Sequence, residues 1–384
     1  MGRNKINFVD LCQGEFGRKT AYTGVDQITP QNVAQVLSDT IGIHNRNRTL
    51  MDYLYRYYKG DQPILYREKL VRPEVNNKVV ENHALETVKF KAGQIYGEPI
   101  QYVCKKKKAS EKTNEQVDRL NDYLDEANAD ARNIQLGIYQ SAVGTAYKAI
   151  LREDEWTKDG DLPPFRIFIP SPQDVYIVYS SVTGKPVLSV QILKDEDNQQ
   201  YYQCYSSRQY FKIQNGVVTE SGINGFGGIP IIEYPNNHDR LSDIEIAITM
   251  YDAINKYQSD RLNGVEQFVQ ALMKFKNCEI DEAEFVKMIK LGAVSVKDVG
   301  NGTQSDVDLM TAELNQSESQ VAKDDIYNNM LIVEAMPNRQ SNTGGDTGNA
   351  VYLRNGWDFA ERDAKLVEAF TKEAEKASAR IISG

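Results

Sequence analysis

Apolar residues recur at helical spacing in two arms of residues 315–382, with a polar stretch between the arms. The first arm carries them at Val321, Ile326, Met330, Val333 and Met336. The second arm has a stripe of mostly small residues at Leu353, Trp357, Ala360, Ala364, Val367, Ala374 and Ile381. Pro337 and the glycines that follow it interrupt the pattern, because proline lacks a backbone donor and glycine relaxes the chain. The pattern predicts a helix, a glycine-rich loop and a long helix.

The opposite face of the second arm alternates in charge, at Arg354, Asp358, Glu361, Arg362, Lys365, Glu368, Lys372 and Glu375. A helix of this kind packs on its apolar side and meets water on the other. Small residues allow a close neighbour, which is either another part of this chain, as in an ordinary helical hairpin, or another copy of it. The pattern alone favours neither alternative.

The first 241 residues predict an arm, several helices and a β region. Residues 1–30 show no clear period, so we expect an arm that becomes ordered only on contact with another molecule. Helical spacing predicts helices within 31–58, 75–97, 115–128 and 132–142. Short alternating segments with Asp-Gly and Asn-Gly turns predict antiparallel hairpins, at 146–152, 165–169, 175–179, 186–193, 200–206, 209–214 and 231–235.

Helical spacing returns after residue 241. Ser242, with Glu245 three positions later, forms a capping box, which predicts a helix over 242–268. Residues 269–313 predict a small mixed insert, with a strand at 269–275, a helix at 282–291 and a strand at 293–299. The insert lies between two long helices, as a cap lies on the end of a stalk. The whole pattern predicts an α+β fold.

The composition is that of a globular protein, since 41% of the 384 residues are hydrophobic and 26% are charged. The net charge of −9 argues against a tight general nucleic-acid binder, although it permits a surface that DNA slides past. We expect neither a transmembrane helix nor secretion, because the sequence has no apolar run of about 18 residues and no apolar signal core. Cys12, Cys104, Cys204 and Cys278 are expected to be reduced thiols.

No catalytic residue, metal site or cofactor is predicted. His44, His83 and His238 lie far apart without the spacing of metal ligands, and Asp195 and Asp197 are not followed by the rest of a calcium loop. The sequence has no phosphate-binding loop of the ATPase type and no nucleophile elbow. The lysines at 105–108 are either a phosphate contact or a solvated loop, and we favour the loop.

Several pieces of the sequence carry a resemblance to one viral family. They are Tyr58-Lys59-Gly60, RPEVNNKVVENHALETVKFKAGQIYGEPI, GGIPIIEYPNN, SDIEIAITMYDAINKYQSDRLNGVEQF, MPN and TGGDTGNAVYLRN. In this order, and over roughly residues 40 to 375, the chain resembles the portal proteins of tailed bacteriophages, of the siphophage type from Gram-positive hosts. Each piece is moderately specific, and the ordered set is strong.

The resemblance implies a head-to-tail connector: a ring, usually a homododecamer, at one capsid vertex of the virion, assembled in the host cytoplasm and without a membrane. Such a ring conducts double-stranded DNA without sequence specificity during genome packaging and ejection. It also docks terminase, capsid or scaffold proteins and head-completion (adaptor) proteins. The implied parts are an arm (1–30), a wing (31–241), a stem helix (242–268), a clip (269–313), a second stem helix (314–336), a tunnel loop (337–350) and a tunnel helix (351–384). A crown beyond the tunnel helix is short, absent or removed.

The resemblance also places the tunnel loop against DNA, through Asn338, Arg339, Gln340, Ser341, Asn342, Thr343, Asp346 and Asn349. A polar lining with few cations makes weak, sequence-blind contacts, in which Arg339 is the strongest phosphate partner and Asp346 repels the backbone. Gly356 is expected to kink the tunnel helix, because glycine costs about 1 kcal/mol in a helix interior. The alternatives are a non-viral ring-forming scaffold and a phosphate-binding enzyme that uses residues 341–350.

Overall fold

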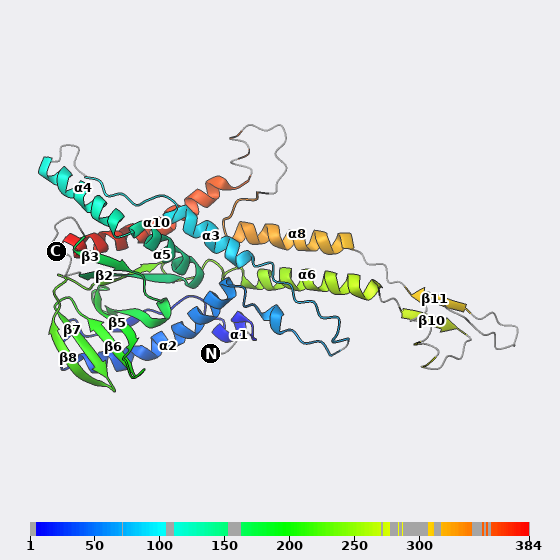
Figure 1. Cartoon of the computed structure of the whole chain (residues 1–384), viewed down its shortest axis with the longest axis horizontal. Helices are drawn as coiled ribbons and strands as arrows, with labels where there is room; N and C mark the ends of the chain where they lie inside the picture. The colour runs from blue at the N-terminus through cyan, green and yellow to red at the C-terminus, as the bar shows by residue number, and fades with distance from the viewer. Residues whose placement is uncertain are drawn as a thin grey trace.

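The computed structural model describes residues 5–70, 72–104, 111–152, 163–269, 272–276, 306–310, 316–339 and 355–383, with the single residues 283, 286, 348 and 351. The molecule is elongated (Figure 1). Two β-sheets and most of the helices form a body, and two antiparallel helices extend from it toward a β-hairpin. The predicted α+β fold is confirmed.

The larger sheet has six strands in the order β1-β4-β5-β6-β7-β8, all antiparallel except for the parallel pair β1 and β4. The strands are β1 (Ala21–Thr23), β4 (Val175–Ser180), β5 (Pro186–Lys194), β6 (Gln200–Tyr205), β7 (Gln209–Gln214) and β8 (Val217–Ile223). Asn215 and Gly216 join β7 to β8 with φ angles of 53° and 77°, as a tight two-residue turn requires. Helix α2 (Val33–Tyr58) contributes Val33, Val36 and Leu37 to the core beside this sheet.

The smaller sheet has three antiparallel strands, β3 (Phe165–Phe168), β2 (Thr145–Arg152) and β9 (Ile231–Pro235), in that order. Helix α5 (Ala129–Val143) leads into β2 through Gly144, which has a φ of 87°. A Cβ atom on Gly144 would lie 2.0 Å from the Arg240 carbonyl oxygen, so only glycine lets the two segments pass here. The body also contains α3 (His83–Tyr96), α4 (Glu111–Glu126), η1 (Pro63–Tyr66) and η3 (Pro172–Asp174).

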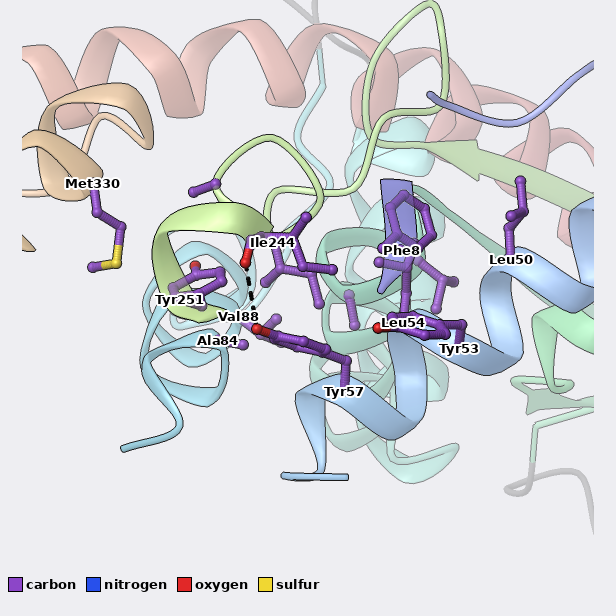
Figure 2. Close-up of a cluster of buried hydrophobic side chains, with 14 of the residues drawn as sticks. Phe8, Leu50, Tyr53, Leu54, Tyr57, Ala84, Val88, Ile244, Tyr251 and Met330 are labelled. Atoms are coloured by element: carbon purple, nitrogen blue, oxygen red, sulfur yellow. Dashed lines mark hydrogen bonds between the residues drawn. The ribbon is translucent and has the colours of Figure 1, made fainter. Parts of the chain in front are cut away.

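The N-terminal segment packs into the body, contrary to the expectation of an arm. Helix α1 (Phe8–Cys12) is buried through Phe8 and Cys12, and the centroid of the Phe8 ring lies 5.4 Å from that of Tyr53 (Figure 2). Ala21 pairs with Val178 in the larger sheet. The expectation was therefore wrong for residues 5–30. These two elements are too short for a hydrophobic period to appear in the sequence.

Helices α6 (Ile248–Val269) and α8 (Gln316–Val333) run side by side away from the body (Figure 1). Beyond their far ends, β10 (Leu272–Lys276) pairs with β11 (Asp306–Met310) as an antiparallel hairpin. Most of β10 overlaps the predicted strand at 269–275, whereas β11 was not predicted. The predicted helix at 282–291 and strand at 293–299 lie outside the described residues, except for 283 and 286.

The capping box at Ser242 does not start a helix. The Ser242 hydroxyl group accepts the Ile244 N–H over 3.2 Å, but residues 243–246 form turns and α6 begins only at Ile248. The Glu245 carboxylate accepts the Gly17 N–H over 2.7 Å and pairs with the Arg18 guanidinium. A distant partner thus overrides the local helix signal.

One core joins the body to the projecting helices. The cluster of buried side chains includes Tyr57 from α2, Val88 from α3, Ile244, Tyr251 from α6 and Met330 from α8 (Figure 2). All five side chains are buried. The near ends of α6 and α8 are therefore fixed to the body, which positions the segment that follows α8. None of the helices in the described residues combines the length and apolarity that a membrane crossing requires.

Helix α10 (Trp357–Ser383) lies along α3 and the smaller sheet. Its small residues Ala360, Ala364 and Ala374 are buried there, so the close neighbour of this stripe is the same chain. Gly356 forms a turn just before α10 and has a φ of 82°. A left-handed residue does not continue a right-handed helix, so Gly356 lies just outside α10. Val351 is also helical, and the Asn355 N–H donates to its carbonyl oxygen over 3.0 Å. That Gly356 kinks a longer tunnel helix stays a prediction, because residues 352–354 lie outside the described residues.

Candidate functional site

Helix α8 ends on the body in a Schellman motif. The Ala335 N–H donates to the Ile332 carbonyl oxygen over 3.2 Å, and the Met336 N–H donates to the Leu331 carbonyl oxygen over 2.8 Å. Ala335 has a φ of 51°, in the left-handed region that glycine usually occupies in this motif. Pro337 follows directly, so the chain leaves the helix at a fixed point.

The two sides of the predicted loop are tied together at its root. The Asn338 N–H donates to the Asn355 carbonyl oxygen over 3.0 Å. The Asn338 side-chain amide donates to the Asn328 side-chain oxygen in α8 over 2.9 Å. Asn355 lies just before the start of α10. These bonds fix the root of the loop at the junction of α8 and α10.

A row of alternating charges leads from α8 to Arg339. The Lys323 Nζ atom lies 2.5 Å from Glu81 Oε1, and Glu81 Oε2 lies 3.2 Å from His83 Nε2. The His83 Nδ1 atom lies 3.0 Å from Glu86 Oε2, and the other Glu86 oxygen contacts the Arg339 guanidinium. The Arg339 side chain is 57% exposed, whereas the other four are between 15% and 24% exposed. These five residues are called the charge row below.

The centre of the charge row is a positively charged histidine. Burial opposes a charge on His83, but its hydrogen bonds to Glu81 and Glu86 and the charges of both carboxylates raise the pKa of His83 to about 9. The hydrogen bond from His83 lowers the pKa of Glu86 despite its burial, and the charges of His83 and Arg339 lower it further. Glu86 is therefore ionised at neutral pH and has two cationic partners.

Beneath the charge row, Glu334 closes a ring of three buried polar groups with Thr87 and Tyr251. The Thr87 Oγ1 atom lies 2.9 Å from Glu334 Oε2 and 2.9 Å from the Tyr251 hydroxyl oxygen, which in turn contacts Glu334 Oε1. Both hydroxyl groups can donate to the carboxylate, and Thr87 Oγ1 also lies 3.1 Å from the His83 carbonyl oxygen. Burial raises the pKa of Glu334 to about 8, although the hydrogen bonds from Tyr251 and Thr87 oppose that shift.

Two further features surround the root. The Lys91 Nζ atom lies 2.5 Å from an Asp363 carboxylate oxygen and joins α3 to α10. An open groove of about 410 Å³ lies between the end of α8 and the start of α10, with Ile332 and Phe359 on its exposed rim.

Among the described residues, no group of three or more His, Cys, Asp or Glu side chains could hold a metal ion. Cys12, Cys104 and Cys204 are free, and Cys278 lies outside the described residues.

The structure places only part of the predicted DNA-facing set. Asn338 and Arg339 lie together at the root of the loop, and Arg339 is already paired with Glu86. Gly356 lies beside Asn355 on the other side of the root. The remaining predicted residues lie outside the described residues, at Gln340, Ser341, Asn342, Thr343, Asp346 and Asn349.

Sequence reasoning missed the residues that hold the root. His83 and Glu86 are one helical turn apart, and Glu81 precedes them, so the segment ENHALE offered a local signal for a paired histidine. Glu334 gave no such signal, because its partners Thr87 and Tyr251 come from two other helices. From the sequence alone, an acidic residue at the end of an amphipathic helix is expected to be exposed to solvent.

Comparison with known proteins gives one firm result. The family model described as "Phage portal protein, SPP1 Gp6-like" matches residues 37–369, which is most of the chain. No curated protein matches. A structure of the neck of an empty GTA particle, computed with C6 symmetry, shares 11% identity at a TM-score of 0.43 and covers 71% of this chain and 72% of its own.

A structure of the neck of a native GTA particle, computed with C12 symmetry, shares 12% identity at a TM-score of 0.41 and covers 72% of this chain and 73% of its own. Both scores are below 0.5, so these two likenesses add no weight. The match to the family model covers most of the chain, and this extent is sufficient to assign the family. The match also agrees with the ordered sequence pieces. The chain belongs to the SPP1 Gp6-like family of phage portal proteins and has the structural role of a portal.

Proposed function

We propose that copies of this chain form a ring at one vertex of the capsid and that residues 337–350 face the channel through which DNA passes. Family membership supports the ring. The observation that carries the orientation is the tied root of the loop, where Asn338 and Arg339 leave the body at the junction of α8 and α10. The ring is most simply a homododecamer, located in the virion.

The elements of the chain suit distinct parts of such a ring. We assign residues 31–241 to the outer wing, α6 and α8 to the stem, 337–350 to the tunnel loop and α10 to the tunnel helix. The hairpin of β10 and β11 lies farthest from the body and belongs to the proposed clip (269–313), which would meet terminase and head-completion proteins (Figure 1). A hairpin at the end of a projecting pair of helices is well placed for such contacts.

A DNA conduit needs contacts that are weak and independent of sequence. The segment that follows α8 is rich in Asn, Gln, Ser and Thr, and the chain carries a net charge of −9. Polar groups of this kind contact phosphates without reading bases, and a low density of cations limits affinity. Arg339 supplies the strongest phosphate contact, while the packaging ATPase is a separate chain.

The test is the amount of DNA packaged by particles that carry Arg339→Ala. We expect particles of normal shape that package or retain less DNA than the wild type. Arg208→Ala, which removes an exposed arginine in the body, is the matched control and should change neither quantity. Unchanged DNA content and retention in the Arg339→Ala particles would remove Arg339 from the conduit.

A further inference from the structure

The Arg339 guanidinium is not free to meet DNA in the isolated chain. It contacts a carboxylate oxygen of Glu86, although 57% of the Arg339 side chain remains exposed. Glu86 lies in the first turn of α3 and is held from the other side by His83 Nδ1 at 3.0 Å. One partner of this ion pair is therefore fixed to a helix, while the other is attached to the root of the loop.

Arg339 can leave the charge row without leaving either carboxylate of the row unpaired. Its cations are Lys323, His83 and Arg339, and its anions are Glu81 and Glu86, so the row carries one excess positive charge. When Arg339 moves away, Glu86 keeps His83 and Glu81 keeps both His83 and Lys323. The four residues that remain then carry no net charge. The excess positive charge is on Arg339, where a DNA phosphate can neutralise it.

We propose that Glu86 is a built-in competitor of DNA phosphate for Arg339 and keeps the contact between the loop root and DNA weak and reversible. The proposal rests on the proposed function, because it requires that the loop root faces DNA. Glu86 offers one carboxylate oxygen to the guanidinium, because His83 holds the other, and a DNA phosphate is an anion that competes for the same guanidinium. The net gain is the difference between two similar interactions, which suits DNA that must move in both directions.

The test is a double-mutant cycle on the full chain, in its assembled form, with a short DNA duplex of arbitrary sequence as the probe. Affinity is measured by fluorescence anisotropy over a series of NaCl concentrations for the wild type, Glu86→Gln, Arg339→Ala and the double variant. Glu98→Gln changes the net charge equally at an exposed position beyond the other end of α3 and is the matched control. Circular dichroism and thermal melting confirm that each variant is folded.

We expect Glu86→Gln to tighten DNA binding by about twofold to fivefold, as removal of one exposed ion pair should. Arg339→Ala should weaken binding and reduce the salt dependence by about one phosphate contact per bound chain. Glu86→Gln should have no effect in the Arg339→Ala background.

Three results would overturn the proposal. They are no tightening by Glu86→Gln, equal tightening by Glu98→Gln, and tightening that persists without Arg339. If Arg339→Ala still weakens binding in these cases, the proposed function stands and only the role of Glu86 falls. If Arg339→Ala changes neither affinity nor salt dependence, the DNA-facing assignment of Arg339 falls as well.

Discussion

The Thr87 hydroxyl group in α3 lies 2.9 Å from the Glu334 carboxyl group at the end of α8, where both are buried. Together with Tyr251 they join three helices beneath the loop root. Asp243 also lies near, and it raises the pKa of Glu334, whereas the charge of Lys91 lowers it. Burial has the largest effect and favours the protonated form of Glu334, although the hydrogen bonds from Tyr251 and Thr87 favour the carboxylate.

The stability of the protein should therefore depend on pH through Glu334. The pKa of Glu334 is raised from 4.5 to about 8 on folding, so its contribution is present at low pH and is lost as the pH rises through about 8. Between pH 5 and pH 9 this contribution falls by roughly 4 kcal/mol. Glu334→Gln keeps a neutral acceptor and should gain in free energy of unfolding, relative to the wild type, as the pH rises.

Urea unfolding of both proteins at several pH values measures this difference, with Glu373→Gln as an exposed control. A difference between wild type and Glu334→Gln that stays constant from pH 5 to pH 9 would show that Glu334 does not carry the proton. The comparison between variants cancels the titration of other groups, such as Asp252, whose pKa burial raises to about 6.

A buried ion pair fixes α10 to the smaller sheet. The Lys148 Nζ atom in β2 pairs with Glu375, which also accepts hydrogen bonds from Tyr102 over 2.7 Å and from Tyr234 over 3.0 Å. Lys148→Met should lower the free energy of unfolding by roughly 3 to 5 kcal/mol, because it leaves a buried carboxylate without a cation. Lys372→Met, which breaks an exposed pair on the same helix, should have little effect. Equal effects in chemical unfolding would contradict this account.

The end of α8 can be made more stable by glycine. Ala335 occupies the left-handed region with a φ of 51°, where a Cβ atom is unfavourable. Ala335→Gly should raise the free energy of unfolding by about 1 kcal/mol, whereas Ala322→Gly, within α8, should lower it by a similar amount. A loss of stability in both variants would show that the Schellman motif does not set the local geometry.

Gly144 should tolerate no side chain. Its φ is 87°, and an added Cβ atom would lie 2.0 Å from the Arg240 carbonyl oxygen. Gly144→Ala should lower the free energy of unfolding by about 2 to 4 kcal/mol. Gly42→Ala, in the open middle of α2, should instead raise it by about 0.5 to 1 kcal/mol. Thermal melting of the two variants gives the comparison, and a stable Gly144→Ala protein would argue against this close approach.

Most elements with a long period were predictable from the sequence, and those set by distant partners were not. The helix predicted over 75–97 was only partly right, because it begins at His83. Apolar spacing identified α6, α8 and α10, and the Asn215-Gly216 turn identified a hairpin. The start of α6 was misjudged because Glu245 binds Arg18, which lies 227 positions away. The small residues of α10 suggested close packing, but only the structure identifies α3 and the smaller sheet as the neighbours.

At the candidate site, too, features with a local sequence signal were predictable, and contacts between distant residues were not. Polar residues, Pro337 and glycines are local signals, and they predicted a loop that includes Asn338 and Arg339. That these residues are held at the junction of α8 and α10 was not predicted. The pairing of Arg339 with Glu86 spans 253 positions and leaves no periodic trace. One glycine in a helical pattern is compatible with a kink and with a left-handed turn, so the sequence alone could not predict the φ of 82° at Gly356.

The most direct test of the conduit is a cryo-electron microscopy map of the assembled protein. The account predicts a closed ring with a central channel, with α10 and the loop root at Asn338 and Arg339 directed toward its axis. Particles without a central channel, or a ring in which this junction faces the outer rim, would contradict it.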